Sequence, residues 1–373
     1  MRIIIMENKK RIFGLDLMRA TAILMVLSSH VLWIYPHSNN YISQLFQVFG
    51  YLGVELFFVL SGFLIGKILY HFYLENDFIL HYVLTFLKRR WLRTLPNYYL
   101  VLMLNIFISF LIGYTISDIW KYFFFLHNFV APMPSFFPES WSLSVEEFAY
   151  LLLPFALFFK TKVVQPKNKA NFFLWVILGL IFFFFCTKVY YAFTTTNTTL
   201  SEWNTGIKAI VVYRLDAVLY GVLAAWVAIN HTLFWTKIRF ISAVLGCLLF
   251  GFLFVGVGFF QLTIETYPNF WNVFYLPLTS FMCLLFLPFL SEWKVNQHAL
   301  FSKTITFISK ISYSIYLLHY SVLLQLLHFY FPSKDMDGFS LHLYTIGYVC
   351  LTFVFSFLLY RFFEKPILDW RDK

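Results

Sequence analysis

Apolar stretches long enough to cross a lipid bilayer recur along the whole chain. A helix needs about 20 predominantly apolar residues to span the hydrocarbon core. Ten such stretches follow one another with short polar connections, and they predict an all-α, polytopic integral membrane protein with a single transmembrane domain over residues 1–373. The predicted spans are 17–35, 49–70, 95–113, 142–159, 172–191, 209–229, 240–260, 271–290, 305–328 and 343–363.

The composition excludes a water-soluble fold. Only 12% of the residues are charged and 60% are apolar, whereas a soluble protein carries about 25% charged residues. The mean hydropathy of +0.73 agrees. The four cysteines lie far apart inside apolar segments without metal-ligand spacing. We therefore expect reduced packing cysteines, no disulfide and no metal site.

The loops predict the orientation of the chain, because Lys and Arg gather on the cytoplasmic side of membrane proteins. With the N-terminus inside, the basic runs 88–93 and 160–169 and both tails lie inside, and only Lys121, Lys208 and Lys334 lie in outer loops. Both termini are then cytoplasmic. The net charge of +10 is explained by this topology and does not indicate a nucleic-acid partner.

The fourth predicted span is open to an alternative. The longest outer loop, about 114–141, contains three prolines and is expected to be irregular and lined by aromatic residues. Its aromatic stretch 119–130 could be interfacial or re-entrant, which would displace the span that comes after it.

The first span carries a stripe of ionisable residues, Asp16, Arg19 and His30. At 100° per residue, Arg19 and His30 share one helical face and lie about 16 Å apart along the axis. Ionisable residues inside a membrane are costly and mark functional sites by default. The stripe predicts an acid–base pair near the cytoplasmic mouth and a histidine deeper in the membrane, although a histidine can also serve packing alone.

Further charges lie in the second and sixth spans. Glu55 lies among glycines near the outer end of the second span, and Ser61 comes later, next to Gly62. Such small residues permit close helix contact or a helix break. Arg214 and Asp216 are two residues apart and therefore do not face each other on a helix, so each is expected to pair with another helix.

A basic cluster precedes the third span. Arg90 and Arg93 are spaced to share one helical face and can fork around the oxygens of a phosphate. The alternative is a topology anchor beside anionic lipid. Pro96 is expected to start the next helix.

The stretch Trp141–Glu147 opens the fourth span at the outer boundary. Ser142 can cap the helix, with Glu146 and Glu147 near its N-terminus, where the helix dipole favours acids. Two adjacent carboxylates also make a candidate general base or substrate anchor. In the ninth span a polar run ends at His319, and Arg361 and Glu364 in the last span are expected to form a terminal ion pair.

In this order, the motifs resemble the membrane acyltransferase-3 family, whose characterised members include bacterial sugar O-acetyltransferases. The resemblance covers about residues 11–366. Its markers are Asp16 and Arg19 with His30, the run Gly53–Leu64, Arg90 and Arg93, the run Trp141–Glu147, Arg214–Asp216, the run Ser312–His319, and Glu364–Pro366.

The resemblance implies transfer of an acetyl or other acyl group from cytoplasmic acyl-CoA, a co-substrate and not a bound cofactor. The acceptor is a hydroxyl of a glycan or lipid-linked sugar at the outer face. Arg90 and Arg93 would hold CoA phosphates, with Arg19 and Ser61 also on the donor side. His30 would act as base or acyl relay.

The remaining motif residues receive expected roles in the same way. Glu146 or Glu147 would act at the outer side, and Asp16 is counted with the catalytic set. Acceptor-side or structural polar roles are expected for Glu55, Trp141, Ser142, Arg214, Asp216 and His319.

Some family members carry a fused extracytoplasmic hydrolase-like domain. We expect none here, so that a separate extracytoplasmic partner is an alternative to acetylation by this chain alone. The alternative functions are a transporter without covalent chemistry and a lipid-binding scaffold.

Overall fold

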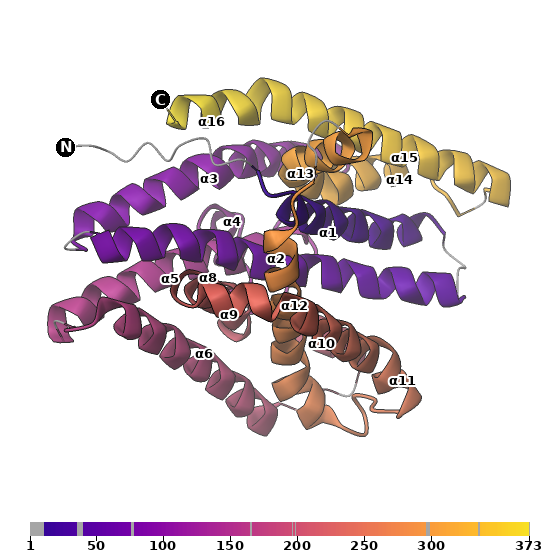
Figure 1. The fold of residues 1–373 in the computed structure, drawn as a ribbon. Coiled ribbons are helices and arrows are strands. Elements are labelled where there is room, and N and C mark those ends of the chain that lie inside the picture. Colours follow the sequence, from indigo (N-terminus) through magenta and orange to yellow (C-terminus); the bar gives the residue numbers. More distant parts are fainter. Residues whose placement is uncertain are drawn as a thin grey trace.

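A computed structural model describes residues 11–35, 40–75, 78–164, 166–195, 197, 199–295, 299–334 and 336–372, and within them every regular element is a helix. The helices pack into one bundle (Figure 1). They are α1 (Phe13–Val31), η1 (Leu32–Ile34), α2 (Tyr41–Glu75), α3 (Leu80–Leu111), α4 (Trp120–Phe123), α5 (Ser140–Val164), α6 (Lys169–Thr194), α7 (Leu200–Trp203), η2 (Asn204–Lys208), η3 (Val211–Tyr213), α8 (Leu215–Asn230), α9 (Thr232–Lys237), α10 (Arg239–Gly251), η4 (Phe252–Gly256), α11 (Val257–Phe259), η5 (Phe270–Tyr275), α12 (Leu276–Glu292), α13 (Leu300–Leu318), η6 (His319–Leu324), α14 (Gln325–Tyr330), α15 (Gly338–Leu359), η7 (Tyr360–Glu364) and α16 (Lys365–Arg371).

Among the described residues, eight helices are long and apolar enough to cross a membrane. They are Phe13–Ile34, Tyr41–Glu75, Leu80–Leu111, Ser140–Val164, Lys169–Thr194, Arg239–Phe259, Phe270–Glu292 and Gly338–Arg371. The predicted all-α membrane fold is thus confirmed, and the fourth predicted span is a helix. The sixth and ninth predicted spans are also helical, as the 16-residue α8 and as α13 continued by η6 and α14. Ten crossings and cytoplasmic termini stay predictions.

The third helix differs most from its predicted bounds. It begins at Leu80, so that the basic run 88–93 lies inside α3 and Pro96 is internal to the helix. The expectation that Pro96 starts the helix was wrong. A proline is tolerated inside a membrane helix where neighbouring groups satisfy the freed backbone carbonyl. Because the segment is helical, Arg90 and Arg93 do lie one turn apart, as predicted.

Glycines allow the helices at the centre of the bundle to pack closely, where α2 lies between α1 and α8. A methyl group added to Gly62 would lie 1.9 Å from the carbonyl oxygen of Val218, and one added to Gly221 would lie 2.0 Å from that of Val59. A methyl group on Gly53 would lie 2.5 Å from the Ala22 carbonyl oxygen of α1. The small residues therefore let the backbones approach closely, as the sequence indicated.

The outer surface and the helix ends fit a membrane protein. Large apolar side chains are exposed along α6, α10 and α15, which is the expected face toward lipid. The end of α16 lies beside the first part of α3 (Figure 1). There Arg89 of α3 donates a hydrogen bond of 3.1 Å to Asp372. The stretch between α3 and α5 is largely irregular and has buried aromatics, including Tyr122 and Phe137, as predicted, and its outer position stays a prediction.

The structure corrects the prediction that all four cysteines are packing residues. All four are free, but only Cys283 is buried, whereas Cys186, Cys247 and Cys350 are exposed. The expectation of four packing cysteines was therefore wrong for three of them, because apolar spans also supply the faces that turn outward.

Candidate functional site: a histidine pair above a charged cluster

Two histidines from distant parts of the chain meet near one end of α1. His30 lies in the last turn of α1, and His319 is the first residue of η6. The His319 Nε2 atom lies 3.2 Å from His30 Nδ1, and the rings meet edge to face with centroids 4.7 Å apart. His319 is fully buried and His30 partly exposed. Two ionisable side chains thus share one site in the membrane.

The backbone fixes the tautomers of this histidine pair. His319 Nδ1 lies 2.8 Å from the carbonyl oxygen of Tyr316, and His30 Nδ1 lies 2.9 Å from that of Val26. A carbonyl oxygen only accepts, so in neutral rings each Nδ1 carries the hydrogen. His319 Nε2 is then an acceptor for the Nδ1–H of His30. The Nε2 lone pair of His30 is left available as a base or nucleophile.

Aromatic and hydroxyl side chains surround the pair. The Tyr320 ring lies 4.7 Å from the His30 ring, and Trp33 lies against Tyr320. The Tyr316 hydroxyl lies 2.6 Å from Ser142 Oγ of α5. Ser142 is therefore linked through Tyr316 to His319, whose ring lies 5.8 Å from the Tyr316 ring, and the neighbouring Trp141 is buried. This result agrees with their expected place on the acceptor side but does not test their role.

The helix that presents His319 is π-helical at that point, and a buried acid holds it. η6 begins at His319, and π-helical turns occur often at functional sites. Glu139 accepts hydrogen bonds from the Ser321 N–H at 3.0 Å and from Ser321 Oγ at 2.5 Å. Its backbone carbonyl accepts from the Tyr316 hydroxyl at 3.0 Å. Glu139 thus ties the start of α5 to the segment that carries His319.

A second cluster of charges lies deeper in the bundle, toward the end where α3 begins. We call Arg19, Arg90, Arg93, Glu146 and Glu147 the inner charged cluster. Its members come from α1, α3 and α5 and interact electrostatically with one another. Ser61 of α2 hydrogen-bonds with Glu146. The residues predicted for the donor side therefore do come together.

The two glutamates lie elsewhere than predicted. The sequence predicts Glu146 and Glu147 at the outer boundary, but Glu147 accepts a 2.6 Å hydrogen bond from Thr94, one residue after Arg93. Glu146 accepts a 2.7 Å bond from Tyr150. The predicted separation of these acids from the arginines was therefore wrong: α5 begins at a buried serine, Ser140, and carries both acids about two turns further along, beside the basic part of α3.

One face of α13 joins the two clusters. Tyr313 donates a 2.8 Å hydrogen bond to the carbonyl of Thr94, next to the inner charged cluster. One turn further, Tyr316 reaches Ser142, and His319 comes next, beside His30. At 1.5 Å per residue, the step from Tyr313 to His319 covers about 9 Å. A continuous polar face therefore leads from the arginines to the histidine pair.

Asp16 lies at the inner end of this face. It accepts bonds of 2.8 and 2.5 Å from Arg11 and one of 2.8 Å from Ser309 of α13. Its ion pair is thus with Arg11 and not with Arg19, although its charge also acts on Arg19. The Asp16 side chain joins α1 to α13, about 21 Å of helix rise away from His30.

The predicted terminal ion pair of the last span is also corrected. Glu364 is buried and accepts hydrogen bonds from Asn97 at 3.0 Å and from Ser314 at 2.7 Å. Arg361 is exposed. At that point the helix is π-helical, which changes the angular spacing on which the expected Arg361–Glu364 contact depended.

The two charged residues of the sixth predicted span each form a buried ion pair, and each pairs with a different helix. Arg214 pairs with Glu55 of α2, whose other oxygen accepts a 2.9 Å bond from Ser280. Lys188 of α6 pairs with Asp216 at 2.7 Å. The prediction that Arg214 and Asp216 each pair with another helix is confirmed. The four side chains of the two pairs are almost completely buried and fix α8 between α2 and α6.

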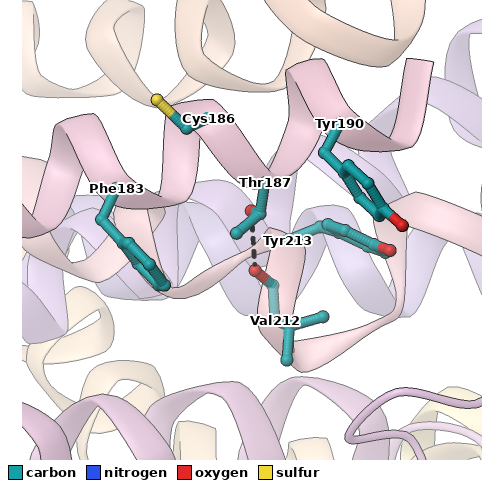
Figure 2. Close-up of a pocket in the computed structure, with 6 residues that line it drawn as sticks. All are labelled: Phe183, Cys186, Thr187, Tyr190, Val212 and Tyr213. Atoms are coloured by element: carbon teal, nitrogen blue, oxygen red, sulfur yellow. Dashed lines mark hydrogen bonds between the residues drawn. The ribbon is translucent and has the colours of Figure 1, made fainter. Parts of the chain in front are cut away.

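A separate hollow of about 300 Å³ lies between α6 and η3 (Figure 2). Its lining is largely apolar, and within it Thr187 donates a 3.1 Å hydrogen bond to the Val212 carbonyl. Three of the lining residues are Phe183, Cys186 and Tyr190 of α6. The hollow offers no acid–base group comparable to the histidine pair, so we do not place chemistry there.

The sequence reasoning missed several residues of the two clusters. Thr94, Tyr313 and Glu139 were not among the candidates, and neither was Lys188. Ser309, Tyr313 and Tyr316 follow the i, i+4, i+7 spacing of one helical face, and this pattern could have identified that face. Nothing in the sequence identifies Lys188 as the partner of Asp216.

Comparisons with known proteins agree with these observations. Residues 12–361 match the family described as "Acyltransferase domain". A protein of Staphylococcus aureus (strain COL), named provisionally as an O-acetyltransferase, is 26% identical over 98% of this chain and 60% of its own length. O-acetyltransferase OatA of Staphylococcus aureus (strain NCTC 8325 / PS 47) is 27% identical over 97% of this chain and 58% of its own length. The chain thus spans about 60% of these relatives. No solved structure matches.

Proposed function

Because the chain belongs to the membrane acyltransferase-3 family, we propose that it moves an acetyl group from acetyl-CoA on the cytoplasmic side to a hydroxyl of a glycan or lipid-linked sugar at the outer face. The observation that carries this proposal is the continuous polar face between the inner charged cluster and the histidine pair.

The inner charged cluster suits the donor. CoA carries several phosphates, and planar guanidinium groups bind such oxygens through paired hydrogen bonds. Arg90 and Arg93 lie one turn apart on α3, and Arg19 of α1 interacts electrostatically with Arg93. We assign the phosphates to these arginines and the flexible acyl-bearing arm to the face of α13 that leads to His30.

His30 is the group at the reacting centre. Its Nε2 lone pair accepts the proton of the acceptor hydroxyl while that oxygen attacks the thioester carbonyl. The new C–O bond forms, the C–S bond breaks, and the proton passes to the CoA sulfur as the thiol leaves. The same lone pair can instead take the acetyl group first and hand it to the hydroxyl, with the same overall balance. His319 orients His30 in either case by accepting its Nδ1–H.

The test is a reconstituted assay. Purified chain in proteoliposomes receives labelled acetyl-CoA, and free CoA and acetylated acceptor are measured. His30→Ala is expected to lower the rate by about 10²–10⁴-fold while the protein still inserts and unfolds at the same temperature. Acetyl groups trapped on the protein by acid quench would select the relay. Full activity of His30→Ala would exclude His30 from the chemistry, and accumulation of acceptor without CoA release would favour transport.

A further inference from the structure

Lys208 differs from the other cations inside the bundle. Arg19 and Arg90 both interact with Glu146, Lys188 pairs with Asp216, and Arg214 pairs with Glu55. Each of those charges is compensated by a carboxylate of the chain. Lys208 is partly buried, and no carboxylate of the described residues interacts with it.

Lys208 is also held in a defined place. It is the last residue of η2, and the carbonyl of the next residue, Ala209, accepts a 2.6 Å hydrogen bond from Asn128. Asn128 bonds in the same way to the Trp141 carbonyl at 3.0 Å. The Lys208 ammonium lies over the Trp141 ring, 5.7 Å from its centroid, and its charge acts on His30.

The ammonium is available to an anion. Burial lowers the pKa of Lys208 to about 8, so Lys208 is still charged in most molecules at neutral pH. An aromatic face compensates only part of a desolvated charge. An anionic oxygen placed beside the ammonium would give Lys208 the compensation that Arg19, Arg90, Lys188 and Arg214 find within the chain.

We propose that Lys208 binds an anionic group of the acceptor, a sugar carboxylate or a phosphate, and thereby selects acidic or phosphate-linked glycans. This inference rests on the proposed function. The donor phosphates have their own arginines in the inner charged cluster, whereas Lys208 lies over Trp141 on a segment that precedes α8, near enough to His30 for its charge to act there. An ammonium is a compact charge with three rotatable donors and binds either anion without demanding a planar, two-pronged geometry.

A binding experiment tests the proposal without requiring catalysis. The full chain in detergent, with saturating CoA added to occupy the donor arginines, is titrated at low salt with trigalacturonate, with its carboxyl-reduced neutral counterpart and with inorganic pyrophosphate. We expect an anion to bind the unmodified chain and Lys208→Arg. Lys208→Gln should bind it about 10-fold or more weakly. Lys334→Gln, which removes an exposed charge, is the matched control and should bind normally. The two anions distinguish a carboxylate from a phosphate source.

Three results would overturn the inference. One is equal binding of the anions to Lys208→Gln and the unmodified chain. Another is no preference of the unmodified chain for either anion over the neutral trisaccharide. In the transfer assay, Lys208→Gln should raise KM for the anionic acceptor at unchanged kcat. The third result is a fall in kcat alone, which would mean that Lys208 stabilises the charge that develops during transfer and does not bind the acceptor. If Lys208→Gln loses anion binding but the unmodified chain never releases CoA, the proposed reaction is contradicted and the anion site is not.

Discussion

The buried pair of Lys188 and Asp216 provides the most quantitative test of the structure. The two charged atoms lie 2.7 Å apart, and both side chains are almost completely buried. At an effective dielectric constant of about 20, two unit charges at that distance attract by about 6 kcal/mol. Removing water from each ion costs several kcal/mol and offsets much of that attraction.

Breaking this pair on one side leaves the partner charged and uncompensated. Lys188→Met and Asp216→Asn are therefore each expected to lower the free energy of unfolding by about 3–5 kcal/mol. The double variant Lys188→Met, Asp216→Asn should recover most of the loss, because no buried charge remains. Lys365→Met is the matched control, since Lys365 and Asp369 form an exposed pair, for which about 0.2–1 kcal/mol is typical.

The assay is reversible unfolding of the purified chain in mixed micelles of increasing denaturing-detergent content, monitored by helix circular dichroism. The refuting result is a single variant that costs no more than Lys365→Met, or a double variant as unstable as the sum of the singles. Either would mean that the two charges do not compensate each other inside the bundle.

Three further variants test other contacts. Arg93→Ala should raise the KM for acetyl-CoA about 10-fold or more. Arg89→Ala removes an exposed arginine that is paired outside the cluster, and it should leave this KM unchanged. If both variants had the same effect, the basic residues would serve only to orient the chain in the membrane. Gly62→Ala should lower the free energy of unfolding by about 1–3 kcal/mol, and Gly179→Ala, which has open space around it, should not. His319→Phe keeps the ring but removes one of the two acceptors for the Nδ1–H of His30, since the Val26 carbonyl remains. It should lower kcat about tenfold at unchanged donor KM, and unchanged kcat would make His319 a packing residue.

Features that depend on periodicity alone are predicted well by the sequence. The lengths of the apolar runs determine the helix positions, and a rotation of 100° per residue places Arg19 and His30 on a shared face. The same geometry gives Arg214 and Asp216 separate partners. These predictions needed no knowledge of which helices are neighbours.

Features that depend on the depth and pairing of helices could not be predicted in this way. Glu146 and Glu147 come after an aromatic, proline-containing loop, and such a loop can be read as lying outside the membrane. In the structure that loop packs inward, with Tyr122 and Phe137 buried, so α5 begins already inside the bundle. Because a hydropathy pattern does not record how deep a loop folds back, it separates both acids from the arginines with which they interact.

The arrangement of the two clusters bears on which substrate has to cross the membrane. His30 lies about 26 Å of helix rise from Phe13, the first residue of α1, and η1 ends only four positions after it, at Ile34. The arginines of the inner charged cluster lie about 16 Å below His30 at the level of Arg19. In the proposed function, an acceptor hydroxyl would need to enter only the outer part of the bundle, while the acyl group would be carried inward from the cytoplasm at the end of a flexible arm. The buried ion pairs support the same view, because charges neutralised in fixed pairs hold helices together and do not form a path for a moving ion.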